Sequence, residues 1–320
     1  MKKIIFLITI IALLKCAGNG LVDLEPNEEI TNLEHTELKQ PKSTNLEKKY
    51  SEEKCTLIDS RDGNKYGCVK VSGLTWMSEN LRYLPAVTPG DQYPVETTSP
   101  YKPLAGYYVY NYTYDSKVSE EENLISALSA EGYNRYGVYY THKAASDACP
   151  IDWHLPNAEE WQSLFLATQE ETGKGEFIQS EFMSDGSLIK RVNPYEKGRW
   201  NGVEAALRSK DWLGYSEGSE SHYPDFEAGS DLFGFNIIGG GMWRPGAKST
   251  SAPGFMRYDN NYRAYFWTSD IVETGKYGGF SELAIGIRIE PVENYPNNDG
   301  AIWTLNMASY NGLAIRCVKD

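Results

Sequence analysis

The pattern of apolar and polar positions divides the chain into three regions. An apolar run from Ile4 to Leu14 follows two lysines and is broken only by Thr9, which is too short for a stable membrane span and typical of a signal peptide. Residues 17–52 are acidic and lack a sustained apolar period, which predicts a disordered acidic tether. From residue 53 to residue 320, short apolar segments bounded by turns predict one folded domain.

Two helices are predicted within this domain, one over residues 157–173 and a shorter one over 142–148. The longer helix starts at a capping box formed by Asn157 and Glu160 and ends at Gly173. Residues 120–128 are a further candidate for a short helix. Strands are predicted at 65–71, 74–77, 233–238, 264–268, 283–289, 301–306 and 313–318. Because helices and strands do not alternate regularly, we expect an α+β domain with several short, mostly antiparallel strands.

The end of the apolar run carries a candidate lipidation site. Cys16 follows Leu14 and Lys15 and precedes small residues, as in bacterial lipoproteins whose cysteine receives a diacylglycerol. Lys15 departs from the small residue usual before that cysteine, and ordinary signal cleavage nearby is the alternative. Residues 1–16 are therefore interpreted as a signal peptide with a lipobox-like end. We expect an exported lipoprotein at the outer membrane or cell surface, or in the periplasm, held to the membrane by its lipid alone.

The net negative charge of the chain argues against some classes of binding partner. The chain has a formal net charge of −13, and loss of the three lysines in the leader takes this to −16. Nucleic acids and anionic membrane surfaces both require basic patches, so we expect neither as a partner.

The other cysteines predict disulfide bonds. Four remain after Cys16, and an even number in an exported chain indicates two disulfides with three possible pairings. Cys55 and Cys68 flank a turn-rich stretch that suits a hairpin, which leaves Cys149 to pair with Cys317. No C-x2-C spacing or histidine cluster accompanies them, so we predict no metal site at these cysteines.

Four blocks of residues carry a resemblance to a known family. They read D-G-N-K-Y at 62–66 with L-T-W-M-S-E-N-L at 74–81, A-C-P-I-D-W-H-L-P at 148–156, F-G-F-N at 233–236, and F-W-T-S at 266–269 with A-I-R-C-V at 314–318. In this order they resemble the Fibrobacter succinogenes major paralogous domain family. Asp152 stands where that family's pattern has glycine, and Thr268 stands where it has serine.

The resemblance implies an exported or surface module, often on lipoproteins, with no settled biochemical activity. The order of helices, tryptophan-containing strand and terminal cysteine strand is similar to the C-type-lectin-like fold. The sulfatase-modifying-factor enzymes share that fold and use a reactive cysteine, which gives an enzyme as the alternative function. A fold alone does not transfer a function.

Aromatic residues supply the candidate binding site. Trp76, Trp153, Trp161, Trp267 and Trp303 fall within helix or strand patterns and are expected in the core. Trp212, Trp243 and the tyrosines at 107, 108, 110, 112 and 114 are expected to be partly exposed. Tyr107, Tyr108, Tyr110, Tyr112 and Trp243 are the candidate ligand-binding residues, as an aromatic strip for a glycan or protein. The alternative is a hairpin that covers the core.

Several histidines and carboxylates could in principle support catalysis or calcium binding. His154 is expected to be a hydrogen-bonded structural residue, and His142 and His222 have no partner pattern for a catalytic triad. Glu79, Asn80, Glu159 and Glu160 are explained by caps and salt bridges. Calcium is a possible ligand near Asp270 and Glu290, but spacing does not select it, and no cofactor is predicted. We therefore expect a non-catalytic module that binds a glycan or an envelope protein, or has a structural role.

Overall fold

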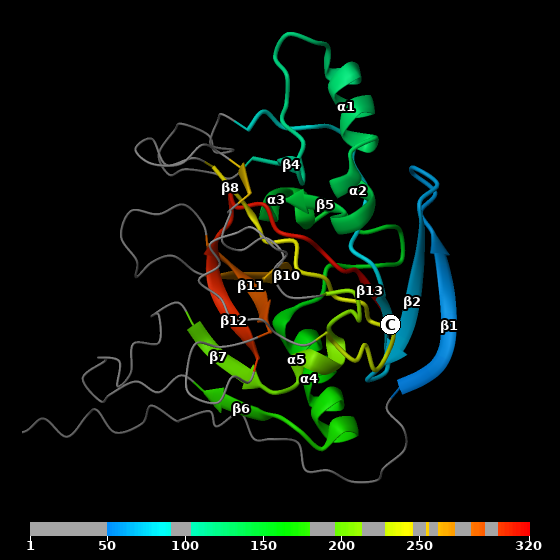
Figure 1. Ribbon diagram of the computed structural model, residues 1–320, viewed down its shortest axis with the longest axis vertical. Coiled ribbons are helices and arrows are strands. Elements are labelled where there is room, and N and C mark those ends of the chain that lie inside the picture. The colour runs from blue at the N-terminus through cyan, green and yellow to red at the C-terminus, as the bar shows by residue number, and fades with distance from the viewer. Residues whose placement is uncertain are drawn as a thin grey trace, which may run out of the picture. The chain divides into compact units, whose positions relative to one another are not determined.

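The computed structural model describes residues 50–90, 104–179, 196–212, 228–245, 254–255, 262–272, 283–291 and 300–320 (Figure 1). The leader, Cys16 and residues 17–49 of the expected tether lie outside these ranges. The first strand begins at Tyr50. None of the helices in the described part of the chain is long and apolar enough to cross a bilayer.

A four-stranded antiparallel sheet opens the domain. Its order is β1-β2-β3-β13, formed by Tyr50–Ile58, Lys65–Val71, Leu74–Met77 and Val318–Lys319. The turn between β1 and β2 contains Gly63 at φ 76°, a left-handed conformation that glycine adopts without steric cost. Cys55 lies opposite Cys68 in this hairpin and the two form a disulfide, with Cα atoms 4.9 Å apart. The predicted pairing is confirmed.

A five-stranded antiparallel sheet forms the centre of the domain. Its order is β10-β11-β12-β7-β6, formed by Ala264–Val272, Leu283–Glu290, Ala301–Ala308, Glu196–Asn201 and Glu176–Gln179. Two short pairs accompany it: β4 (Tyr107–Val109) with β5 (Val138–Tyr140), and β8 (Trp243–Arg244) with β9 (Gly254–Phe255). The second predicted disulfide, Cys149 to Cys317, is also present, with Cα atoms 5.8 Å apart. The prediction of a disulfide-bonded α+β domain with antiparallel strands is confirmed.

Successive side chains of the central strands belong alternately to two hydrophobic clusters, one on each face of the sheet. Phe266 of β10 belongs to a cluster with Trp76 of β3 and with Trp161, Leu164 and Phe165 of α4 (Ala158–Thr172). The neighbouring Trp267 belongs to a second cluster that contains residues of α1, α2 and α3 (Glu120–Leu128, Glu131–Tyr136 and His142–Ala145). Since adjacent residues of a strand point to opposite faces, the sheet is packed on both sides. Figure 1 shows α1–α3 and α4–α5 on either side of it, with α5 at Glu204–Leu207.

Several predicted boundaries are wrong for local reasons. Residues 233–238 do not form a strand, because Gly234 and Asn236 adopt φ values of 71° and 52° and turn the chain. Of the strand predicted at 313–318, only the last residue lies in β13, while Leu313 and Ala314 form isolated bridges with Tyr140 and Phe266. The helix predicted at 142–148 ends at Ala145. The candidate at 120–128 is a helix, α1, and the described residues form two further short helices that were not predicted, α2 and α5.

One departure from the resembled pattern has a structural counterpart. Asp152, which stands in place of glycine, adopts φ 65°, the left-handed region that glycine favours. The turn before Trp153 therefore keeps the conformation that a glycine would give it. Aspartate tolerates this region better than most side chains do.

The capping box at Asn157 is a testable contribution to stability. Its Oδ1 accepts a hydrogen bond from the Glu160 amide at 2.8 Å, and the Glu160 carboxylate accepts from the Asn157 amide at 2.7 Å. Replacing Asn157 with alanine is expected to lower the free energy of unfolding by about 1 kcal/mol in urea denaturation. Asn157→Asp keeps a side-chain acceptor, so its free energy of unfolding should fall by only a few tenths of a kcal/mol. Equal stability of Asn157→Ala and the parent protein would show that the cap contributes nothing.

Candidate functional site

The predicted aromatic strip is not one exposed face. Tyr108 and Trp243 are both 3% exposed and stack on each other with ring centroids 3.6 Å apart. Gly312 permits this packing, because an added Cβ there would lie 3.0 Å from Trp243 and 3.1 Å from Tyr108. The expectation of partial exposure is wrong for these two rings and for Trp212, which is also buried. The burial of Tyr108 and Trp243 agrees instead with the alternative prediction, in which the tyrosine-rich segment covers the core.

The remaining tyrosines of the candidate site are half-buried, and each contacts a different set of residues. Tyr107 packs edge-on against Tyr140, and the Tyr112 hydroxyl donates to Asn123 at 2.7 Å. Tyr110 contacts the rings of Tyr136 and Phe255. Of the five tryptophans expected in the core, four are buried, and Trp153 is half-buried against it.

Groups considered for catalysis form structural contacts. His142 is buried, with Nε2 2.9 Å from the Thr268 carbonyl oxygen. His154 is exposed, and its Nε2 lies 2.8 Å from Oε1 of Glu160, so its predicted hydrogen bond is confirmed. His222 lies outside the described residues.

The carboxylates considered for calcium are also engaged. Oδ2 of Asp270 accepts from the Ala158 amide at 2.7 Å. Glu290 accepts from Arg263 and from the Trp303 indole, both at 2.7 Å. No group of three or more potential metal ligands from His, Cys, Asp and Glu occurs within the described residues.

Arg316 instead joins three of the sequence blocks. Its side chain is 1% exposed, and its Nε donates to Oδ1 of Asn80 at 2.9 Å. Nη1 donates to the carbonyl oxygens of Met77 and Phe235, and Nη2 donates to that of Asn236 at 3.0 Å. Residues 77–80, 235–236 and 316 are distant in sequence, so this guanidinium fixes their relative positions. Burial lowers the pKa of Arg316 to about 9.

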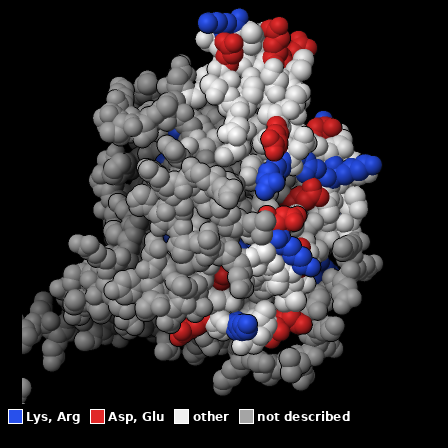
Figure 2. Space-filling model, in the orientation of Figure 1, with Lys and Arg blue, Asp and Glu red and all other residues white. Residues whose placement is uncertain are grey.

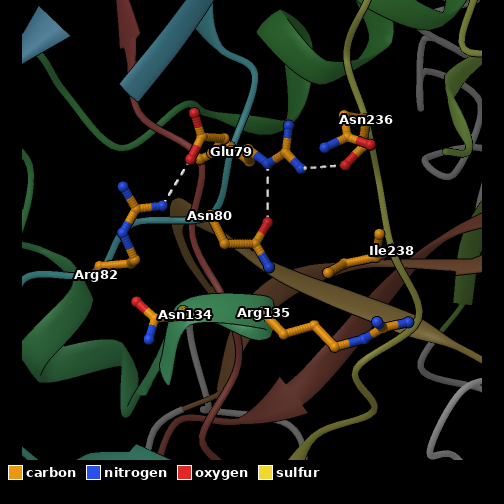
Figure 3. Close-up of a pocket in the computed structure, with 9 residues that line it drawn as sticks. Glu79, Asn80, Arg82, Asn134, Arg135, Asn236 and Ile238 are labelled. Carbon is orange, nitrogen blue, oxygen red and sulfur yellow. Dashed lines mark hydrogen bonds and ion pairs between the residues drawn. The ribbon is translucent and has the colours of Figure 1, made fainter. Parts of the chain in front are cut away.

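A hollow of about 130 Å³ opens beside this guanidinium. It is lined by Glu79, Asn80, Arg82, Asn134, Arg135, Gly137, Asn236, Ile238 and Arg316. Figure 3 shows Asn80, Ile238 and Arg135 around the opening, with Glu79 and Arg82 to one side. Three guanidinium groups and one carboxylate line the hollow, so its lining is positive although the chain as a whole is acidic.

No pattern in the sequence indicated this hollow. Glu79 and Asn80 were assigned to caps and salt bridges; Glu79 does pair with Arg82, whereas Asn80 forms neither and instead bonds to Arg316 and to the Tyr136 carbonyl oxygen. Arg316 carried a signal, because it is the one charged residue in the apolar stretch 313–318. Charged side chains in such stretches are buried only with several hydrogen-bond partners. Arg135 lies on α2, a helix that no sequence pattern indicated.

Glu79 forms the rim of the hollow and gives a pH-dependent prediction. Burial alone would raise its pKa, but hydrogen bonds from the Gly67 amide at 2.9 Å and from Arg82 at 2.6 Å outweigh burial and hold the pKa below its ordinary value of 4.5. A depressed carboxyl pKa stabilises the fold above the unfolded-state pKa, and this stabilisation is lost as pH falls through the folded-state value.

The wild-type protein should therefore exceed Glu79→Gln in free energy of unfolding at pH about 7, and the gap should close below pH about 4.5. Urea denaturation of both proteins across this range measures the gap. A difference that stays constant down to pH about 3 would contradict the assignment.

Comparisons with known proteins agree with the sequence blocks. The family model of the Fibrobacter succinogenes major domain matches residues 69–319, a span that contains every residue lining the hollow. Searches against curated proteins and against solved structures gave no match. The family match covers most of the chain and confirms the resemblance read from its motifs. The chain therefore belongs to the Fibrobacter succinogenes major domain family.

Proposed function

We propose that this chain is a non-catalytic binding module of an exported lipoprotein, and that the hollow beside Arg316 is its ligand contact. The ligand is a glycan or another envelope protein. The observation that carries the proposal is the convergence of Asn80, Asn236 and Arg316, from three separate blocks, on one concave polar surface. Concave sites with a few convergent polar groups are the usual form of binding sites.

The hollow is suited to binding because several of its polar groups are not engaged within the protein. The side-chain amides of Asn134 and Asn236 and the guanidinium of Arg135 are exposed and, in the part of the chain that the structure describes, make no hydrogen bond. Amides both donate and accept, as sugar hydroxyls do. Figure 2 shows acidic and basic side chains interspersed over the described part of one face, so the local positive charge suits a small ligand group better than an extended polyanion.

A C-type-lectin-like arrangement is the finer fold assignment that we propose. In support, the Cys149–Cys317 disulfide ties the segment before α4 to the end of the chain, and Trp267 of β10 is fully buried. Lipid attachment at Cys16 is likewise proposed, on the basis of the leader and the small residues after Cys16. A purely structural role in the envelope is the alternative to a binding role, and the glycan array described next distinguishes the two.

A glycan array probed with the mature protein, with and without calcium, tests the function. We expect binding to a defined set of polysaccharides that does not depend on calcium. Absence of binding to every glycan in both conditions would contradict the glycan reading and leave an envelope protein or a structural role. Binding only with calcium would contradict our assignment of Asp270 and Glu290 to structural bonds.

The alternative of an enzyme on a sulfatase-modifying-factor-like scaffold requires a reactive thiol. Cys55, Cys68, Cys149 and Cys317 are all in disulfides, so none of these is a free nucleophile. Thiol titration of the unreduced, denatured mature protein should find none of these four cysteines reactive. One or two reactive thiols among them would revive the enzyme alternative.

A further inference from the structure

Arg316 is a buried cation whose hydrogen-bond partners are all neutral. It donates to three main-chain carbonyls and to one side-chain amide oxygen. Within the residues that the structure describes, no carboxylate is bonded to it, and Glu79 and Asp231 act on it only through space. A guanidinium has five N–H donors, and these bonds use four of them, which leaves one on Nη2. An anion placed beside it would be favoured, because charge burial without a counter-ion is costly.

The rim adds donors that suit an anion carried on a sugar. Arg135 lies on α2 with its guanidinium 5.4 Å from the Tyr136 ring centroid, and it forms no ion pair with any residue of the described ranges. Arg82 is already paired with Glu79, so its positive charge is largely neutralised within the protein. The exposed amides of Asn134 and Asn236 flank the same opening and can meet hydroxyl groups.

One wall of the hollow is apolar. Ile238 lines the hollow, and it packs on the buried aromatic cluster of Tyr108, Tyr136, Tyr139 and Trp243. Tyr110 and Phe255 are half-buried on that same cluster. The Ile238 side chain, supported by this cluster, can contact the C–H face of a sugar ring while the polar wall meets the ring's substituents.

We propose, resting on the binding function above, that the hollow binds the carboxylate of a uronic acid residue in a glycan. A carboxylate is planar and matches the paired N–H groups of the Arg135 guanidinium, and the remaining N–H on Nη2 of Arg316 can donate one further bond. Glu79 on the rim repels a doubly charged phosphate more strongly than a singly charged carboxylate. The volume of about 130 Å³ is well below that of a pocket enclosing a whole ligand, so the site takes one substituent of a chain that continues outside.

Calorimetry with trigalacturonic acid and with its methyl ester tests this directly, since the ester keeps the rings and removes the charge. At about 50 mM salt we expect the acid to bind the folded mature protein at least about tenfold more tightly than the ester. Arg135→Gln should weaken acid binding about tenfold and leave the ester unchanged. Lys117→Gln removes the same charge at an exposed site before α1 and should change neither affinity.

The other outcomes separate the two proposals. Equal binding of acid and ester, or acid binding that Arg135→Gln leaves unchanged, would overturn the uronate assignment while the binding function stands. Inorganic phosphate or a sulfated trisaccharide that binds more tightly than the acid would show that the anion class is wrong. Absence of binding by both acid and ester overturns the uronate assignment, and the glycan array then decides whether the binding function fails with it.

Discussion

Replacing Arg316 with methionine is expected to lower the free energy of unfolding by about 3 to 5 kcal/mol. Methionine keeps much of the side-chain volume but leaves Oδ1 of Asn80 and the carbonyl oxygens of Met77, Phe235 and Asn236 without their donor. Each buried acceptor without a partner costs about 1 to 3 kcal/mol, and removing a buried charge offsets part of the sum. Urea denaturation followed by tryptophan fluorescence measures the loss.

Arg82→Gln is the matched control for this prediction. Arg82 is half-buried and pairs with Glu79, whose side chain is 37% exposed, so its removal should cost less than about 1 kcal/mol. A small loss for Arg316→Met, no larger than that of the control, would show that Arg316 does not hold the three segments together.

Removing the Cys149–Cys317 disulfide by a double substitution to alanine is expected to cost about 5 kcal/mol. The bond closes a loop of 168 residues, whereas the Cys55–Cys68 bond closes one of 13. In the chain-entropy model a cross-link restricts the unfolded chain more when its loop is longer, which gives about 3 kcal/mol for the shorter loop. Since domains are stable by only about 5 to 15 kcal/mol, loss of the long-range bond approaches the whole stability.

The Cys55→Ala, Cys68→Ala protein is the comparison, measured in urea under the same buffer. We expect it to remain folded and to lose clearly less stability than the first double variant. Equal losses, or a larger loss at the hairpin, would contradict a cross-link effect that scales with loop length.

The sequence predicted those elements whose signals are local. The helix α1 and the strands β2 and β3 have the predicted bounds, and α4 begins and ends at its predicted caps. Asn157 with Glu160 and the αL Gly173 define α4 without any distant contact. Strands at 264–272 and 283–290 were found because their apolar runs are long, although β10 extends past the predicted end at Thr268.

The sequence could not predict features that depend on contacts between segments far apart in the chain. Tyr108 and Trp243 are 135 positions apart, so their stacking could not be seen in the tyrosine pattern, and that pattern suggested an exposed strip. The hollow depends in the same way on Arg316 meeting Asn80, 236 positions earlier. Motif density marked the right blocks, but only the fold shows that they meet around one guanidinium.

The most direct measurement is an NMR titration of ¹⁵N-labelled mature protein with the glycan that binds most tightly on the array. The Arg316 Nε–H is buried and bonded to Asn80, and the Trp267 indole N–H is buried and bonded to the Tyr140 carbonyl, so both protons should give slowly exchanging signals. We predict that the Arg316 signal shifts in proportion to saturation while the Trp267 signal stays in place. Binding that leaves the Arg316 signal unchanged would place the ligand elsewhere and contradict the assignment of the site.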